Sequence, residues 1–239
     1  MISEGTGSRV AALLFPQEVR LARFIRDNGL TIVLVLLFLG SLIGQWLTGV
    51  RFENELLIEH GQEPISALAF LQDAQFLSTV FENWESEFLQ MAMYVILTAV
   101  LFQRGSAESK DPDAKPRDAS LNRKTQKSDA PSPLRRGPLI RVLYAHSLGL
   151  SLLALFIASF GLHWFFSAKQ AAEEAALHGG QGAPLSDYHF SPQLWFESFQ
   201  NWQSEFLSAA VLVVLSIWLR QKNSPESKPV TAPHSQTGT

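Results

Sequence analysis

The chain has 239 residues, of which 46% are hydrophobic and 17% charged, with no cysteine and a formal net charge of −3. These averages are ordinary for a soluble protein of one or two domains. The absence of cysteine excludes a disulfide scaffold, a thiolate metal site and a cysteine nucleophile. The slightly acidic balance argues against a protein dedicated to nucleic acid. The apolar residues, however, are gathered in four blocks.

The first and third blocks, residues 29–50 and 142–168, contain no Asp, Glu, Lys or Arg. Because about 20 apolar helical residues cross the hydrocarbon core of a bilayer, both blocks predict membrane-spanning helices. The first block is too long, and begins too far into the chain, to be a cleaved signal peptide.

The second and fourth blocks are shorter, but an apolar stripe at helical spacing extends each of them toward the N-terminus. They predict further spans at about residues 77–102 and 195–219, since buried helices of a soluble domain fit poorly beside two apolar spans. Tryptophan favours the headgroup level of a membrane. The residues expected to anchor the four spans there are Trp46, Trp84, Trp164 and Trp202.

The basic residues predict the orientation of the spans. Of the 19 Lys and Arg residues, 17 lie before the first block, between the second and third, or after the fourth. The positive-inside rule then places both termini and the central loop in the cytoplasm.

An internal repeat underlies the four blocks. Residues 81–89 read FENWESEFL, and residues 199–207 read FQNWQSEFL, 118 positions later. At this offset residues 21–110 align without gaps on residues 139–228, and 28 of the 90 pairs are identical. Each repeat holds two predicted spans in the same orientation. We therefore expect an all-α membrane protein whose four helices form a bundle of two parallel two-helix repeats.

The remaining segments are polar. Residues 111–138 are rich in Pro, Ser, Asp and Lys, and predict a disordered cytoplasmic linker between the repeats. Residues 229–239 predict a disordered tail, and residues 1–20 a cytoplasmic N-terminal segment.

A polar stripe marks one face of the second and fourth spans, and forms the candidate intramembrane site. Glu87 and Glu205 occupy equivalent positions of the two repeats. A carboxylate at the edge of the hydrocarbon layer is costly unless it faces the bundle interior, water or a partner. Gln45 and His163 lie at similar depth, so a His163–carboxylate pair would be proton-sensitive. The alternative is that these side chains only hold the helices together. The candidate residues are Asn83, Glu87, Gln90, Asn201, Glu205, Ser208, Gln45 and His163.

The two outer loops each contain His-Gly after acidic residues, at His60 and His178. Carboxylates and imidazoles bind divalent cations, but the ligand spacing of known metal sites is missing, so we expect no metal and no cofactor. Nucleophile, phosphate-loop and dinucleotide motifs are likewise missing, which argues against an enzyme.

The sequence resembles a family of uncharacterised bacterial four-span membrane proteins that is defined only as a domain of unknown function. The resemblance lies in RFIRDNGL at residues 23–30, HGQEP at 60–64, FENWESEFLQM at 81–91 and FQRGSAESKDP at 102–112. It implies a location in the bacterial inner membrane and supplies no reaction.

Three functions remain open, of which a membrane enzyme is supported only by the Glu and His residues of the outer loops; the other two carry more of the evidence. The first is a non-enzymatic structural or interaction protein, with the lipid bilayer and a second copy or another membrane protein as partners. The second is a small transporter or proton or ion conductor that uses Glu87 and Glu205 near the repeat axis.

Overall fold

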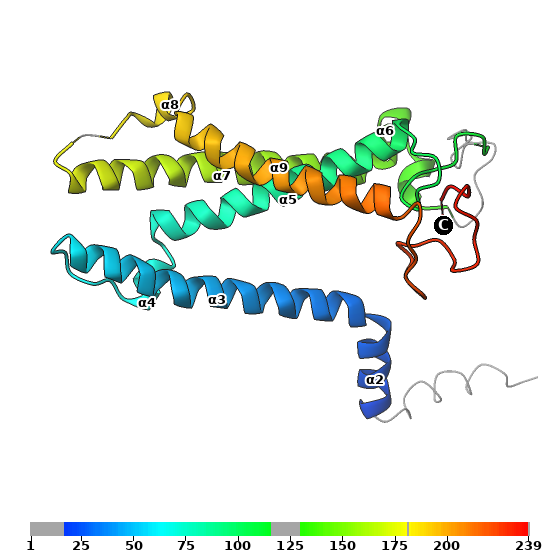
Figure 1. Cartoon of the computed structure of the whole chain (residues 1–239), viewed down its shortest axis with the longest axis horizontal. Coiled ribbons are helices and arrows are strands. Elements are labelled where there is room, and N and C mark those ends of the chain that lie inside the picture. Colours follow the sequence, from blue (N-terminus) through cyan, green and yellow to red (C-terminus); the bar gives the residue numbers. More distant parts are fainter. Residues whose placement is uncertain (1–16, 116–129, 181, 239) are drawn as a thin grey trace, which may run out of the picture. The chain divides into compact units, whose positions relative to one another are not determined.

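The structure is a computed structural model that describes residues 17–115, 130–180 and 182–238. All regular secondary structure in these ranges is helical (Figure 1). The chain divides into two units, Met1–Gln72 and Asp73–Thr239, and each is described by itself.

The described part of the first unit, residues 17–72, contains α2 (Gln17–Asp27), α3 (Gly29–Glu59) and α4 (Ala67–Phe70). Only Asn28 separates α2 from α3, and its backbone, with φ −123° and ψ 15°, leaves the helical region. As a result α3 begins in a new direction, and α2 turns away from its axis (Figure 1).

The short helix α4 folds back on α3. The Phe70 ring is 2% exposed and lies so close to Gly49 that a Cβ there would be 2.7 Å from the ring. The Trp46 indole donates a hydrogen bond of 2.7 Å to the carbonyl oxygen of Ala67. A glycine opposite the ring thus lets α4 approach the helix backbone.

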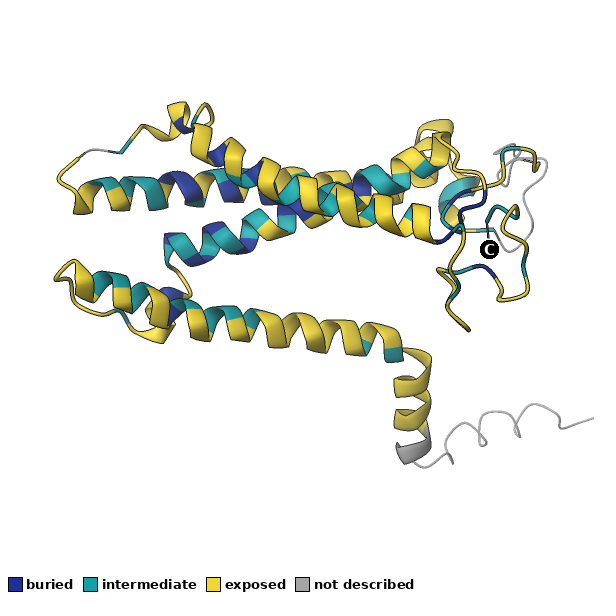
Figure 2. Ribbon diagram, viewed as in Figure 1, coloured by how far each residue is buried: buried dark blue, intermediate teal, exposed yellow. Residues whose placement is uncertain are grey.

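The second unit contains α5 (Ala74–Val100), η2 (Ser132–Arg135), α6 (Pro138–Ala145), α7 (Ser147–Leu177), α8 (Leu185–Tyr188) and α9 (Pro192–Leu215). α5 packs along both α7 and α9. The buried residues gather where these helices meet, and the outer faces stay exposed (Figure 2). Small or polar side chains dominate this seam, and they allow close approach of the helices. They include Ala74, Ser78, Glu85 and Ala92 on α5, and Ser159, His163 and Ser167 on α7.

The C-terminal segment is held against the end of α5. Lys228 is 1% exposed, and its ammonium donates to the carbonyl oxygens of Ile217, His234 and Gln236 at 3.2, 3.0 and 2.9 Å, and to that of Gly105. These contacts give no support to the prediction of a disordered tail at residues 229–239.

Most helix boundaries of the two halves coincide at the offset of 118 residues, whereas the C-terminal ends of α5 and α9 lie 115 residues apart. α3 and α7 differ by 118 at both ends, and α4 and α8 do so as well. Gly61 and Gly179 follow the caps of α3 and α7 with φ of 70° and 74°, the left-handed conformation that ends helices at glycine. Both long helices therefore end by the same local mechanism.

Two of the described helices, α3 and α7, are long and apolar enough to cross a membrane. α3 begins at the predicted residue 29 but continues nine residues beyond residue 50. The span predicted at residues 142–168 is interrupted at His146, where α6 ends and α7 begins. The spans predicted at residues 77–102 and 195–219 correspond to α5 and α9, and four membrane crossings remain a prediction.

The predicted linker, residues 111–138, is described only at its two ends. Residues 116–129 lie outside the described part of the chain, as do residues 1–16 of the predicted N-terminal segment. Near the end of the linker, residues 132–135 form the short helix η2.

Candidate functional site: a buried histidine between two carboxylates

The ring of His163 lies between two carboxylates inside the second unit. Its Nδ1 is 3.0 Å from Oε2 of Glu85 on α5, and its Nε2 is 3.3 Å from Oε2 of Glu197 on α9. The side chains of His163 and Glu85 are fully buried, and that of Glu197 is 24% exposed. We call these three residues the His163 cluster.

Neighbouring side chains satisfy the remaining oxygens of the His163 cluster. The Trp202 indole donates to Oε1 of Glu85 at 3.1 Å, and the Gln193 amide donates to Oε1 of Glu197 at 2.9 Å. Ser167, one turn from His163 on α7, donates to Oε2 of Glu197 at 3.1 Å. Each carboxylate oxygen of the cluster therefore has a hydrogen-bond partner.

A second contact joins Ser167 to α8. The hydroxyl oxygens of Ser167 and Tyr188 are 2.9 Å apart, and Tyr188, on α8, is 4% exposed. Burial raises the pKa of the Tyr188 hydroxyl above its usual 10.0, so this hydroxyl keeps its proton at neutral pH. A chain of hydrogen-bonding groups thus leads from α8 through Ser167 and Glu197 to His163.

The geometry constrains the protons of the His163 cluster. A neutral imidazole has one N–H, whereas both ring nitrogens of His163 face a carboxylate. Both contacts are hydrogen bonds at the same time when the ring carries two protons and donates to each carboxylate. The imidazolium then compensates one of the two buried negative charges. Nearby, Glu82 accepts a hydrogen bond from the Asn201 amide, which joins α5 to α9 a second time.

The structure pairs His163 with Glu85 and Glu197, whereas the sequence placed Glu87 and Glu205 at a depth similar to that of His163. Glu87 and Asn83 are exposed, and Glu205 is half-buried. The sequence contains a pattern that could have identified Glu85 as buried. Ser78, Glu85 and Ala92 are seven residues apart, which places them on one face of the helix.

The other predicted site residues make separate contacts. Gln90 of α5 donates to the hydroxyl of Ser208 and to the carbonyl oxygen of Glu205, both at 2.9 Å, which links α5 to α9. Gln45 is half-buried in the first unit. The ring of Trp164 lies edge-on to His189, and that of Trp84 lies edge-on to Phe81.

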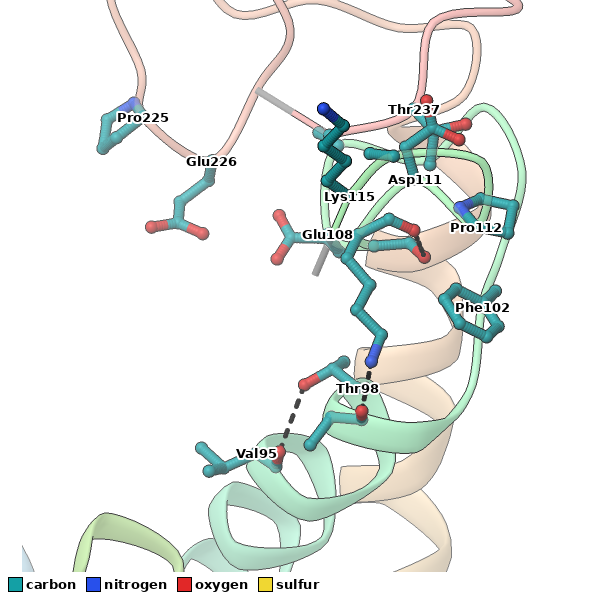
Figure 3. A pocket seen from close by; sticks show the side chains of 16 residues that line it. Val95, Thr98, Phe102, Glu108, Asp111, Pro112, Lys115, Pro225, Glu226 and Thr237 are labelled. Atoms are coloured by element: carbon teal, nitrogen blue, oxygen red, sulfur yellow. Dashed lines mark hydrogen bonds between the residues drawn. The ribbon is translucent and has the colours of Figure 1, made fainter. Parts of the chain in front are cut away.

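A separate cavity of about 860 Å³ lies at the C-terminal end of α5 (Figure 3). Glu108 and Glu226 line it and point toward one another in this view, while Tyr94 donates to Glu108 at 2.8 Å. Burial raises the pKa of the Glu108 carboxyl above its usual 4.5. Among the described residues no group of three His, Asp or Glu side chains is arranged to hold a metal ion.

The comparisons give a family without an assigned activity. No curated protein and no solved structure matches the chain. The family profile described as a domain of unknown function, DUF6766, matches residues 21–239. This range includes both long apolar helices and every residue of the His163 cluster. The chain therefore belongs to the DUF6766 family.

Proposed function

We propose that the protein is an integral protein of the bacterial inner membrane, with four spans, two parallel repeats and both termini in the cytoplasm. The boundaries of α3 and α7, and those of α4 and α8, agree at an offset of 118 residues and support the repeat. The hydrogen bond between Gln90 and Ser208 also supports it, because these residues occupy equivalent positions, as expected beside a pseudo-twofold axis. The apolar side chains exposed along α3 and α7 suit contact with lipid.

Within that membrane the protein acts as a structural or interaction component and not as an enzyme. The observation that carries this proposal is the His163 cluster, in which three helices are joined through side chains that satisfy one another. Such an arrangement holds α5, α7 and α9 in one register, because separating them would leave buried charges without partners. Neither the cavity of Figure 3 nor the groove of about 370 Å³ between α5 and α9 is lined by a residue of the cluster.

Proton conduction is the second candidate, and the chain from Tyr188 to Glu85 is the observation that favours it. Ser167, Glu197 and His163 can each accept and donate a proton in turn, and Glu197 is exposed in part. This version of the hypothesis places the path at Glu85 and Glu197, in addition to the predicted Glu87 and Glu205.

Reconstituted proteoliposomes separate the two candidates. With an imposed pH gradient, a structural protein dissipates the gradient no faster than protein-free liposomes, in wild type and in Glu197→Gln alike. Gln at position 197 retains an amide for Ser167 and lacks the titratable group. A proton flux above that of empty liposomes that is lost in Glu197→Gln, and retained in the control Glu59→Gln at an exposed position outside the proposed path, would replace the structural proposal with conduction.

A further inference from the structure

Two short helices precede the long apolar helices, and each is amphipathic. On α2, Leu21, Phe24 and Ile25 share one face and are 58%, 59% and 50% exposed. Arg20, Arg23 and Arg26 follow the opposite face at spacings of three residues. Among the residues that the structure describes in the first unit, none covers this apolar face of α2.

α6 repeats this arrangement in the second unit. Leu139, Val142 and Leu143 stand 118 positions after the three apolar residues of α2, and are 70%, 53% and 50% exposed. Arg141 lies on the opposite face, and Arg135 and Arg136 directly precede the helix. No acidic residue occurs between positions 131 and 145.

A change of direction separates each short helix from the long helix that follows. Asn28 and His146 have φ values of −123° and −112°, with ψ close to zero, so α2 and α6 do not simply extend α3 and α7. If α3 and α7 cross the membrane, a short helix that bends away at their N-terminal ends reaches the interface between headgroups and acyl chains. Amphipathic helices with arginine on the polar face bind there.

We propose that α2 and α6 lie in the plane of the cytoplasmic membrane interface and bind anionic lipid headgroups through their arginines. This inference rests on the proposed membrane insertion of α3 and α7. Charge complementarity identifies the occupant, because the cytoplasmic leaflet is negatively charged and attracts basic residues next to a span. The apolar face of each helix continues directly into a long apolar helix, so the same lipid that surrounds α3 and α7 covers it.

The absence of cysteine makes a site-directed test clean, because each introduced cysteine carries the only label. Spin labels at Leu21→Cys and Leu139→Cys report the apolar faces, and labels at Asp27→Cys and Ala145→Cys report the opposite sides. The full-length protein is reconstituted in bilayers of phosphatidylcholine and phosphatidylglycerol. We expect the labels at positions 21 and 139 to be accessible to oxygen, which concentrates in lipid. The labels at positions 27 and 145 should be accessible to a water-soluble nickel chelate. A label at Leu36→Cys, in the apolar first half of α3, tests membrane insertion itself.

The outcomes are distinguishable. Nickel access at Leu21 and Leu139 together with a deep Leu36 would overturn the inference and leave the proposed membrane location intact. Nickel access at Leu36 would instead contradict the proposed membrane location. If the labels at positions 21 and 139 were protected from both reagents, a protein partner would cover these faces. Spectra broadened by spin–spin coupling would identify that partner as a second copy of the chain. Either result would also overturn the inference.

A second measurement addresses the arginines. Spin-labelled phosphatidylglycerol should associate with the full-length protein more strongly than phosphatidylcholine does. Arg23→Gln and Arg136→Gln should each reduce this preference, by up to about fivefold per arginine. Arg104→Gln is the matched control, because Arg104 is exposed and pairs with Asp113 outside both helices. An unchanged preference in the first two variants, or an equal loss in all three, would overturn headgroup binding at α2 and α6.

Discussion

The buried carboxylate of Glu85 depends on two donors, the ring of His163 and the indole of Trp202. Removing one partner of a buried ion pair leaves a charge without compensation, which costs about 3–5 kcal/mol. We predict that His163→Ala lowers the free energy of unfolding by this amount, measured by reversible denaturation in bicelles. Glu87→Ala, at an exposed position on the same helix, should change stability by less than about 0.5 kcal/mol.

The repeat suggests a neutral replacement for the same pair. Gln45 and Gln203 stand at the positions equivalent to His163 and Glu85. The double variant His163→Gln with Glu85→Gln leaves no unpaired buried charge between these two positions, so we predict higher stability than in His163→Ala. If the double variant were as unstable as His163→Ala, the attraction between the two charges would itself stabilise the helix packing. Avoiding an unpaired buried charge would then not be enough.

Glu108 gives a pH dependence whose sign follows from its raised pKa. Burial favours the protonated carboxyl in the folded protein, so its contribution to stability is fully present below the unfolded pKa of about 4.5 and is lost as the pH rises through the higher folded pKa. We predict that wild type loses stability relative to Glu108→Gln as the pH rises above about 4.5. Parallel stability curves for the two proteins would contradict this.

The sequence singled out Glu87 and Glu205 as the carboxylates at the depth of His163, and not Glu85 and Glu197. Repeat symmetry directed attention to positions that are identical in both halves. Glu85 is replaced by Gln203 in the second half, and Glu197 corresponds to Thr79 in the first. The His163 cluster arises where the two halves differ, and symmetry alone therefore could not find it.

At the scale of elements, the contact between α4 and α3 depends on one glycine. A side chain at Gly49 would displace the Phe70 ring and with it the hydrogen bond from Trp46 to Ala67. We predict that Gly49→Val releases α4 and makes the peptide bond after Phe70 sensitive to chymotrypsin in the intact protein. Gly40→Val is the matched control, because nothing lies within 4 Å of its Cβ position on the same helix. Equal cleavage of the two variants would contradict the role of Gly49.

The predicted helices lay close to the observed ones, and the differences have local causes. Apolar composition ended the first span at residue 50, whereas the helix continues until Gly61 adopts its left-handed conformation. Composition cannot detect the interruption at His146 either, since apolar residues flank it on both sides. α5 and α9 begin three residues before the predicted starts, directly after the N-caps Asp73 and Ser191, whose side chains accept hydrogen bonds from the first turn.

At the scale of the whole molecule, the charge distribution leads to a topology that can be tested directly. Seventeen of the 19 basic residues belong to the segments assigned to the cytoplasm. We predict that Glu59→Cys and His178→Cys, at the ends of α3 and α7, react in intact cells with a maleimide that does not cross the inner membrane. Arg104→Cys and Ser224→Cys, beyond the predicted second and fourth spans, should react only after the inner membrane is permeabilised. Labelling of Arg104→Cys in intact cells would mean that α5 does not return to the cytoplasm. In that case the four-span arrangement and the parallel orientation of the repeats would both fail, because each requires that residues 104 and 224 lie on the same side as the N-terminus.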